Sequence, residues 1–170
     1  MFVGRKHVRP HQPIMLQFHR TERYLKRMRR VYAGTPHVYE NPKDYEDDVA
    51  SFFINCHHLS DWIAHQYPEQ ITKKQIDAFI NQHDALRVCS DLCNASKHCK
   101  IQRVRTGSQP SLTGKEWMIV TYEQRLKKPV TFFGKYKVVS GATKHDALEL
   151  AESAFNLWRN LNRKLALKRI

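Results

Sequence analysis

Apolar side chains recur at helical spacing along several long stretches of this 170-residue sequence, and that periodicity limits the chain to a mainly helical fold. The clearest stretch runs from 43 to 66, and its stripe contains Val49, Phe52, Phe53, Cys56, Leu59 and Ile63. It begins among acidic residues, which suit the positive end of a helix dipole, and Pro68 ends it. We therefore predict a helix over 43–66 with one face in the core.

The same spacing predicts three more helices before the chain changes character, over 12–32, 72–82 and 84–101. Thr72 and Asp84 have short polar side chains that suit the N-caps of the last two helices.

Two β-branched and aromatic runs between 115 and 139 predict a β-hairpin. The stretch 140–170 predicts a long final helix with the apolar stripe Leu148, Ala151, Phe155, Trp158, Leu161 and Leu165. We expect a single domain over 1–170: a mainly α fold, a bundle of about five helices with one β-hairpin inserted before the last helix.

Positive charge dominates the sequence, with a formal net charge of +13 at pH 7. The charge is uneven, because residues 1–32 contain nine Lys or Arg and one acid, whereas 40–61 contains six acids and one Lys. A polyanion is the natural partner of such a surface, since each neutralised phosphate releases counterions. Solvated charged faces are the simpler alternative.

The absence of a membrane span and of a secretory signal leads to an expectation about the cell compartment, and the compartment in turn leads to one about the cysteines. No apolar run approaches the roughly 20 residues of a membrane span, and the basic N-terminus has no apolar core of a secretory signal. We therefore expect a cytoplasmic protein that does not contact a membrane. The four cysteines are then expected to be reduced, with no disulfide framework and no cofactor.

The segment "LRVCSDLCNASKHCKI", 86–101, concentrates chemically active side chains. On a helix, one face contains Ala85, Val88, Cys89, Leu92, Ser96 and Cys99, with Cys93 at its margin. The cysteines therefore point with apolar residues, which favours buried thiols over a metal site. A separate polar stripe contains Arg87, Asp91, Asn94 and His98.

The helix over 43–66 has a second notable face opposite its core stripe. This face contains Ile54, His58, Asp61 and His65, with Asn55 and Trp62 along one flank. An aliphatic residue and two histidines there indicate that the helix is covered on two sides, by the chain itself or by a second copy.

His98 offers a route to RNA cleavage without a metal. Its neutral imidazole can take a proton from a ribose 2′-hydroxyl, whose oxygen then attacks the adjacent phosphate, while Lys97 or an arginine stabilises the developing charge. The alternative for both His58 and His98 is a structural histidine held by hydrogen bonds.

Two short motifs, "FFINCHHLSDWI" and "CSDLCNASKHCKI", followed by a hairpin and "LAESAFNLWRNL", resemble the HEPN superfamily. More closely, the chain is similar to uncharacterised bacterial and phage proteins with NCxHLxDW and NxSKH elements. The resemblance covers about 45–165. It implies a helical bundle, usually a homodimer, and often a ribonuclease of toxin–antitoxin or antiphage systems.

The HEPN resemblance also implies site residues. It places His98 and Asn94 at the histidine and polar positions of the family motif, and Cys93 at the arginine position. An arginine would then have to come from the helix over 12–32 or from a partner. The catalytic candidates are His98, Asn94, Lys97 and His58, and the candidates for site support or an interface are Arg87, Asp91, Asp61 and Trp62.

Three functions follow from these observations. The first is a HEPN-like RNA-binding protein of a defence or stress system, active as a metal-independent endoribonuclease if His98 is catalytic, with phosphate contacts from Arg20, Arg23, Arg27 and Arg30. The second is a non-catalytic module, antitoxin-like, regulatory or a phage-encoded inhibitor, whose polar stripe contacts a protein partner. The third is a DNA-binding regulator, although the sequence contains no clear helix-turn-helix motif.

Overall fold

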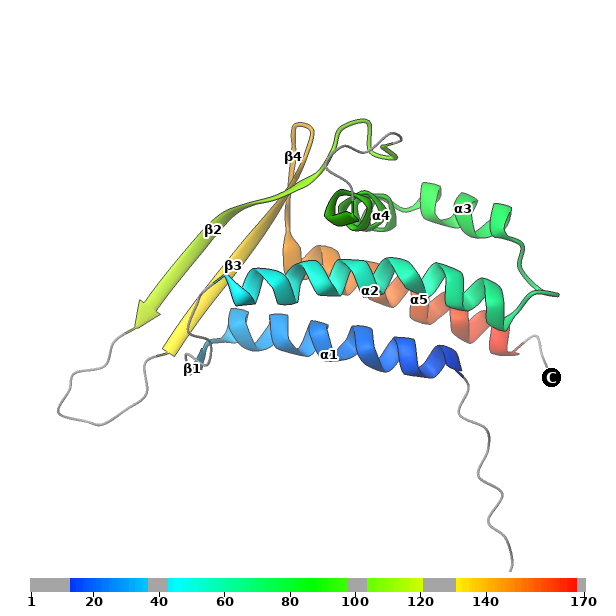
Figure 1. The fold of residues 1–170 in the computed structure, drawn as a ribbon, viewed down its shortest axis with the longest axis horizontal. Coiled ribbons are helices and arrows are strands. Elements are labelled where there is room, and N and C mark those ends of the chain that lie inside the picture. Colours follow the sequence, from blue (N-terminus) through cyan, green and yellow to red (C-terminus); the bar gives the residue numbers. More distant parts are fainter. Residues whose placement is uncertain (1–12, 37–42, 98–103, 121–130, 168–170) are drawn as a thin grey trace, which may run out of the picture.

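The structure is a computed structural model that describes residues 13–36, 43–97, 104–120 and 131–167. In chain order its elements are α1 (Pro13–Ala33), β1 (Thr35–Pro36), α2 (Asp44–Gln66), α3 (Lys73–Gln82), α4 (Asp84–Lys97), β2 (Ser111–Val120), β3 (Thr131–Ser140), β4 (Thr143–Asp146) and α5 (Ala147–Leu167). The predicted fold class, a helical bundle with a hairpin before the last helix, is confirmed (Figure 1).

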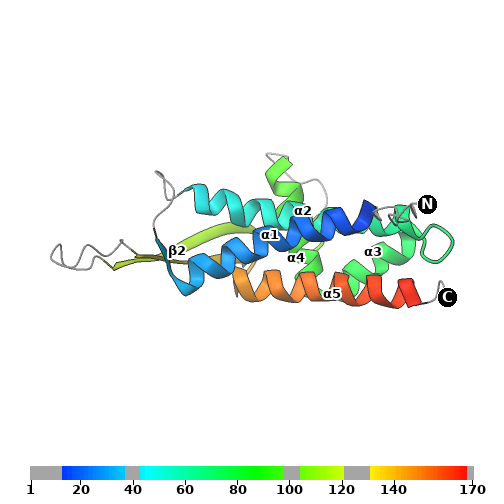
Figure 2. The same cartoon turned by 90° about the horizontal axis from the view of Figure 1, so that it is seen from below.

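Three long helices form the body of the molecule. α1 and α2 lie side by side, α5 packs against both, and the start of α1 lies at the same end as the end of α5 (Figures 1 and 2). α4 runs across α2 rather than along it, and α3 connects the two (Figure 1). Large side chains such as Phe52, Leu59 and Trp158 are almost fully buried between these helices.

Side chains cap the starts of α3 and α5, whereas Lys43 at the start of α2 makes no side-chain cap hydrogen bond. Thr72 caps α3 as predicted: its Oγ1 accepts from the Gln75 backbone N at 3.3 Å, and Gln75 Oε1 accepts from the Thr72 N at 2.8 Å. Asp146 caps α5, since its Oδ1 accepts from the Leu148 N at 2.8 Å. The prediction for Asp84 is wrong, because it is the first residue of α4 and its carboxylate accepts from Arg87.

The sheet is antiparallel, and β3 is its central strand. β2 pairs along one edge of β3, from Ser111 opposite Val139 to Val120 opposite Thr131. The two short strands share the other edge, β1 at the Thr131 end and β4 at the Ser140 end. The hairpin is thus confirmed, but its first strand begins at Ser111, four residues before the predicted start at 115.

β1 and β4 were not predicted, and β4 corrects the start of the last helix. The sequence prediction began that helix at 140, whereas α5 begins at Ala147 after β4. The backbone over 143–146 pairs with the edge of β3 instead of coiling.

Tyr32 joins the sheet to the helical body at the end of α1. Its Oη donates to the Tyr136 carbonyl at 3.1 Å and accepts from the Tyr136 backbone N at 3.0 Å. None of the described helices combines the length and the apolar character needed to cross a bilayer.

Candidate nucleic-acid interface

One side of α1 is buried and the other is basic. The buried residues are Ile14, Gln17, Phe18, Thr21, Leu25, Met28 and Val31. The outward residues include six Lys or Arg and one acid, Glu22. The four predicted phosphate contacts, Arg20, Arg23, Arg27 and Arg30, follow one another at spacings of three, four and three, so they share one face, which we call the arginine face.

The members of the arginine face differ in how they are held. Arg27 Nη1 lies 2.8 Å from Asp48 Oδ1 on α2, and Arg20 Nη1 donates to Gln17 Oε1 at 3.2 Å. Arg23 and Arg30 are exposed and have no acidic partner among the residues that the structure describes. Two arginines of this face are therefore available to an incoming anion.

Basic residues continue on the neighbouring helix. Between 153 and 167, α5 contains Arg159, Arg163 and Lys164 and no acid, and all three side chains are exposed. Arg159 and Arg163 are one turn apart and face α1 across a pocket described below. These two residues were not among the predicted site residues, although their spacing of four is visible in the sequence.

The polar stripe of α4 is largely engaged within the chain. Asp91 is fully buried, and its carboxylate accepts from the backbone N atoms of Arg105 (3.0 Å) and Thr106 (2.9 Å) and from Thr106 Oγ1 (2.9 Å). Arg87 Nη2 lies 2.9 Å from Asp84 Oδ1. Asp91 thus supports the loop 104–108 rather than facing solvent.

The remaining catalytic candidates are only partly placed. Asn94 is half-buried on α4, and His58 is half-buried on α2 with its ring centroid 6.4 Å from that of His57. The side chain of Lys97 and the whole of His98 lie outside the described residues. The structure therefore leaves the proposed grouping around His98 as a prediction.

The other two support candidates lie on the outer side of α2. Asp61 is exposed and borders a hollow of about 220 Å³ that Asp77 and Arg105 also line, whereas Trp62 is half-buried against the core. Arg105 is already engaged there, since its Nη2 lies 2.9 Å from Asp77 Oδ1.

The thiols face the interior. Cys56, Cys89 and Cys93 are all buried, so the inward direction predicted for Cys89 is confirmed. Two predictions for this helix are wrong: Cys93 is fully buried rather than at the margin of the apolar face, and Ser96, which was predicted on that face, is exposed. Burial raises the pKa of the Cys89 thiol well above its usual value, and a hydrogen bond with Cys56 adds to the rise. Among the described residues, no three His, Cys, Asp or Glu side chains lie together as metal ligands would.

No protein-family model, no curated protein and no solved structure matches this chain. The resemblance to HEPN proteins therefore stays a prediction that rests on the two short motifs.

Proposed function

We propose that this protein binds RNA through the arginine face of α1. The observation that supports the proposal best is the state of Arg23 and Arg30, which are exposed on a rigid helix without an acidic partner among the described residues. Arginine presents a planar fork of donors that matches the oxygens of a phosphate.

The geometry of α1 suits a polyanion better than a small anion. Arg20 and Arg30 are ten residues apart, which is about 15 Å along a helix, a length over which a nucleic acid presents several phosphates. The net charge of +13 adds a long-range attraction that speeds encounter. RNA is chosen over DNA on the basis of the HEPN resemblance, which also suggests a role in defence or stress.

The test is the salt dependence of RNA binding by the double variant Arg23→Ala/Arg30→Ala. We expect weaker binding of a labelled single-stranded RNA and a slope of log Kd against log salt reduced by about 1.4, because each lost phosphate contact on a single strand removes about 0.7. Fluorescence anisotropy over a salt series measures both quantities.

The control removes the same charge elsewhere. Lys73 and Lys74 are exposed on α3, which does not pack against α1 (Figure 1). Lys73→Ala/Lys74→Ala should leave the slope nearly unchanged. Wild-type affinity that is independent of salt, or equal losses in the two double variants, would contradict the proposal.

The non-catalytic interaction module remains the alternative. It would use the polar stripe of α4 to contact a protein partner, yet the carboxylate of Asp91 at the centre of that stripe accepts three hydrogen bonds from its own chain. Among the described members, only Arg87 and Asn94 are partly exposed. RNA binding by α1 is therefore the function that the geometry supports better.

A further inference from the structure

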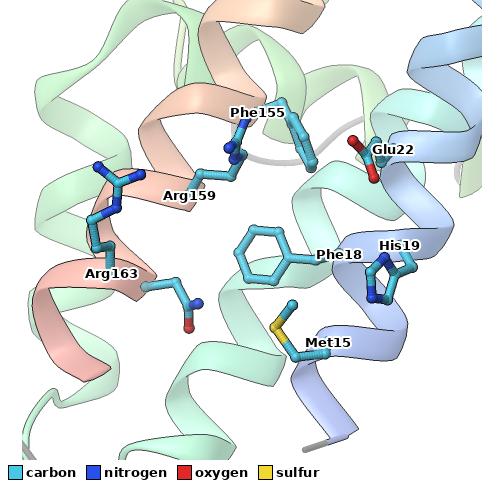
Figure 3. Close-up of a pocket in the computed structure, with 8 residues that line it drawn as sticks. Met15, Phe18, His19, Glu22, Phe155, Arg159 and Arg163 are labelled. Carbon is cyan, nitrogen blue, oxygen red and sulfur yellow. The ribbon is translucent and has the colours of Figure 1, made fainter. Parts of the chain in front are cut away.

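A second feature of the basic surface is a pocket between the first half of α1 and the second half of α5 (Figure 3). Its volume is about 390 Å³, within the range of about 300–1,000 Å³ that is usual for small-molecule sites. Because α1 and α5 come from opposite ends of the sequence, no sequence motif predicted this pocket.

The α5 wall of the pocket is cationic. Arg159 and Arg163 line it one turn apart, and neither has an acidic partner among the described residues. The Arg159 guanidinium lies over the Phe155 ring, 5.9 Å from its centroid, and this contact restricts where the group can point. Two neighbouring guanidinium groups can donate several charge-assisted hydrogen bonds to a single phosphate.

The α1 wall supplies different chemistry. His19 is exposed at the rim and can donate or accept a hydrogen bond, and Glu22 lies on the side opposite Arg163 (Figure 3). The Glu22 carboxylate is 3.7 Å from Lys26 Nζ, so its charge is partly balanced, and its oxygens can accept from sugar hydroxyls.

Apolar side chains separate the two walls. Phe18 occupies the middle of the pocket, and the centroids of the Phe18 and Phe155 rings are 6.0 Å apart (Figure 3). Met15 extends beside Phe18 with 37% of its surface exposed. A flat, weakly polar ring would cover this surface and lose little hydration.

We propose that the pocket binds a nucleotide unit ending in a phosphomonoester, with the phosphate on Arg159 and Arg163 and the base against Met15 and Phe18. The inference rests on the proposed function in one respect: on RNA, such a group is a 5′-phosphate end. A free mononucleotide carries the same chemistry. The pocket and the arginine face have no residue in common, so separate substitutions test them.

The first experiment uses small ligands. Calorimetric titration should show binding of 5′-AMP and at least about tenfold weaker binding of adenosine, because adenosine lacks the charged group. Arg159→Ala/Arg163→Ala should lose the preference for AMP, and Arg159→Lys/Arg163→Lys should keep part of it. Lys164→Ala, which removes a charge beside the pocket, should bind AMP as the wild type does. Thermal melts followed by circular dichroism check that each variant is folded.

The second experiment compares an RNA oligonucleotide with a 5′-phosphate and the same RNA with a 5′-hydroxyl. The wild type should prefer the phosphorylated end several-fold, Arg159→Ala/Arg163→Ala should abolish the preference, and Arg23→Ala/Arg30→Ala should weaken both RNAs equally. RNA binding without any preference for AMP or the 5′-phosphate would overturn the pocket inference and leave the proposed function intact. AMP binding without RNA binding would support the pocket and refute the proposed function.

Discussion

Gly34, between α1 and β1, has a backbone conformation and surroundings that only glycine satisfies. Its φ of 93° lies in the left-handed region, and a Cβ there would overlap the Phe133 ring. Gly34→Ala should therefore lower the free energy of unfolding by about 2–4 kcal/mol, through backbone strain plus overpacking. Urea unfolding followed by circular dichroism measures the change.

Gly107 provides the matched control. It has a similar φ of 86°, but a Cβ at that position would have no heavy atom within 4 Å. Gly107→Ala should therefore cost only the backbone strain, about 1 kcal/mol. Equal losses at the two positions would mean that Phe133 does not constrain the junction between α1 and the sheet.

Asp91 marks where prediction from sequence reaches its limit at the scale of single residues. The helical spacing correctly separates it from Cys89, but its burial depends on backbone amides 14 and 15 positions away, in the loop 104–108. Periodicity describes one helix and carries no information on a loop that folds back onto it. The same limit applies to Cys93, which is fully buried although the helical spacing places it at the margin of the apolar face.

At the scale of elements, long periodic segments were predictable and short strands were not. The helix over 43–66 has many apolar residues in one stripe, so its boundaries differ from α2 by a single residue at the start. β4, with the sequence TKHD, has no alternating apolar pattern, and it is a strand because it pairs with the edge of β3. Asp146, with Glu149 three residues later, was a readable start signal for α5.

The contact between α1 and the sheet gives an element-scale prediction at alkaline pH. Burial raises the pKa of Tyr32 from 10.0 to about 12. The folded state therefore keeps this proton at pH values where the unfolded state has lost it. The resulting stability is complete below pH 10 and is lost as the pH rises toward 12. Tyr32→Phe should show a shallower alkaline loss than the wild type.

The same variant has a cost at neutral pH. Without the hydroxyl, the Tyr136 backbone N and carbonyl each lose a hydrogen bond, which should cost about 1–3 kcal/mol. Urea unfolding across the alkaline range measures both effects. Tyr24→Phe is the control on the same helix, since the Tyr24 ring contacts Arg27 rather than the sheet. An alkaline profile of Tyr32→Phe identical to that of the wild type would contradict this account.

At the scale of the whole molecule, the bundle and its charge follow from the sequence, whereas the crossing of α4 over α2 and the pocket between α1 and α5 do not. Both arise from packing between segments that are distant in the chain.

The predicted homodimer is not tested by the structure of the single chain and stays a prediction. The face of α2 that contains Ile54, His58, Asp61 and His65 is only partly covered in the single chain, so a second copy has room to pack there.

Catalysis is the last whole-molecule question, because it needs a bound RNA and a base in one place. If His98 removes the 2′-hydroxyl proton, purified protein should degrade RNA in EDTA, and His98→Ala should be at least about 100-fold slower. His65→Ala is the matched control, since His65 is exposed on α2 and has no part in the proposed chemistry. The motif of the HEPN proteins has an arginine where this chain has Cys93. If an arginine of the arginine face takes that role, Arg23→Ala/Arg30→Ala should slow cleavage as well as binding. Equal RNA decay by the wild type and His98→Ala would remove His98 from the mechanism. If the wild type degrades no RNA even when it is saturated with RNA, the protein binds RNA without nuclease activity.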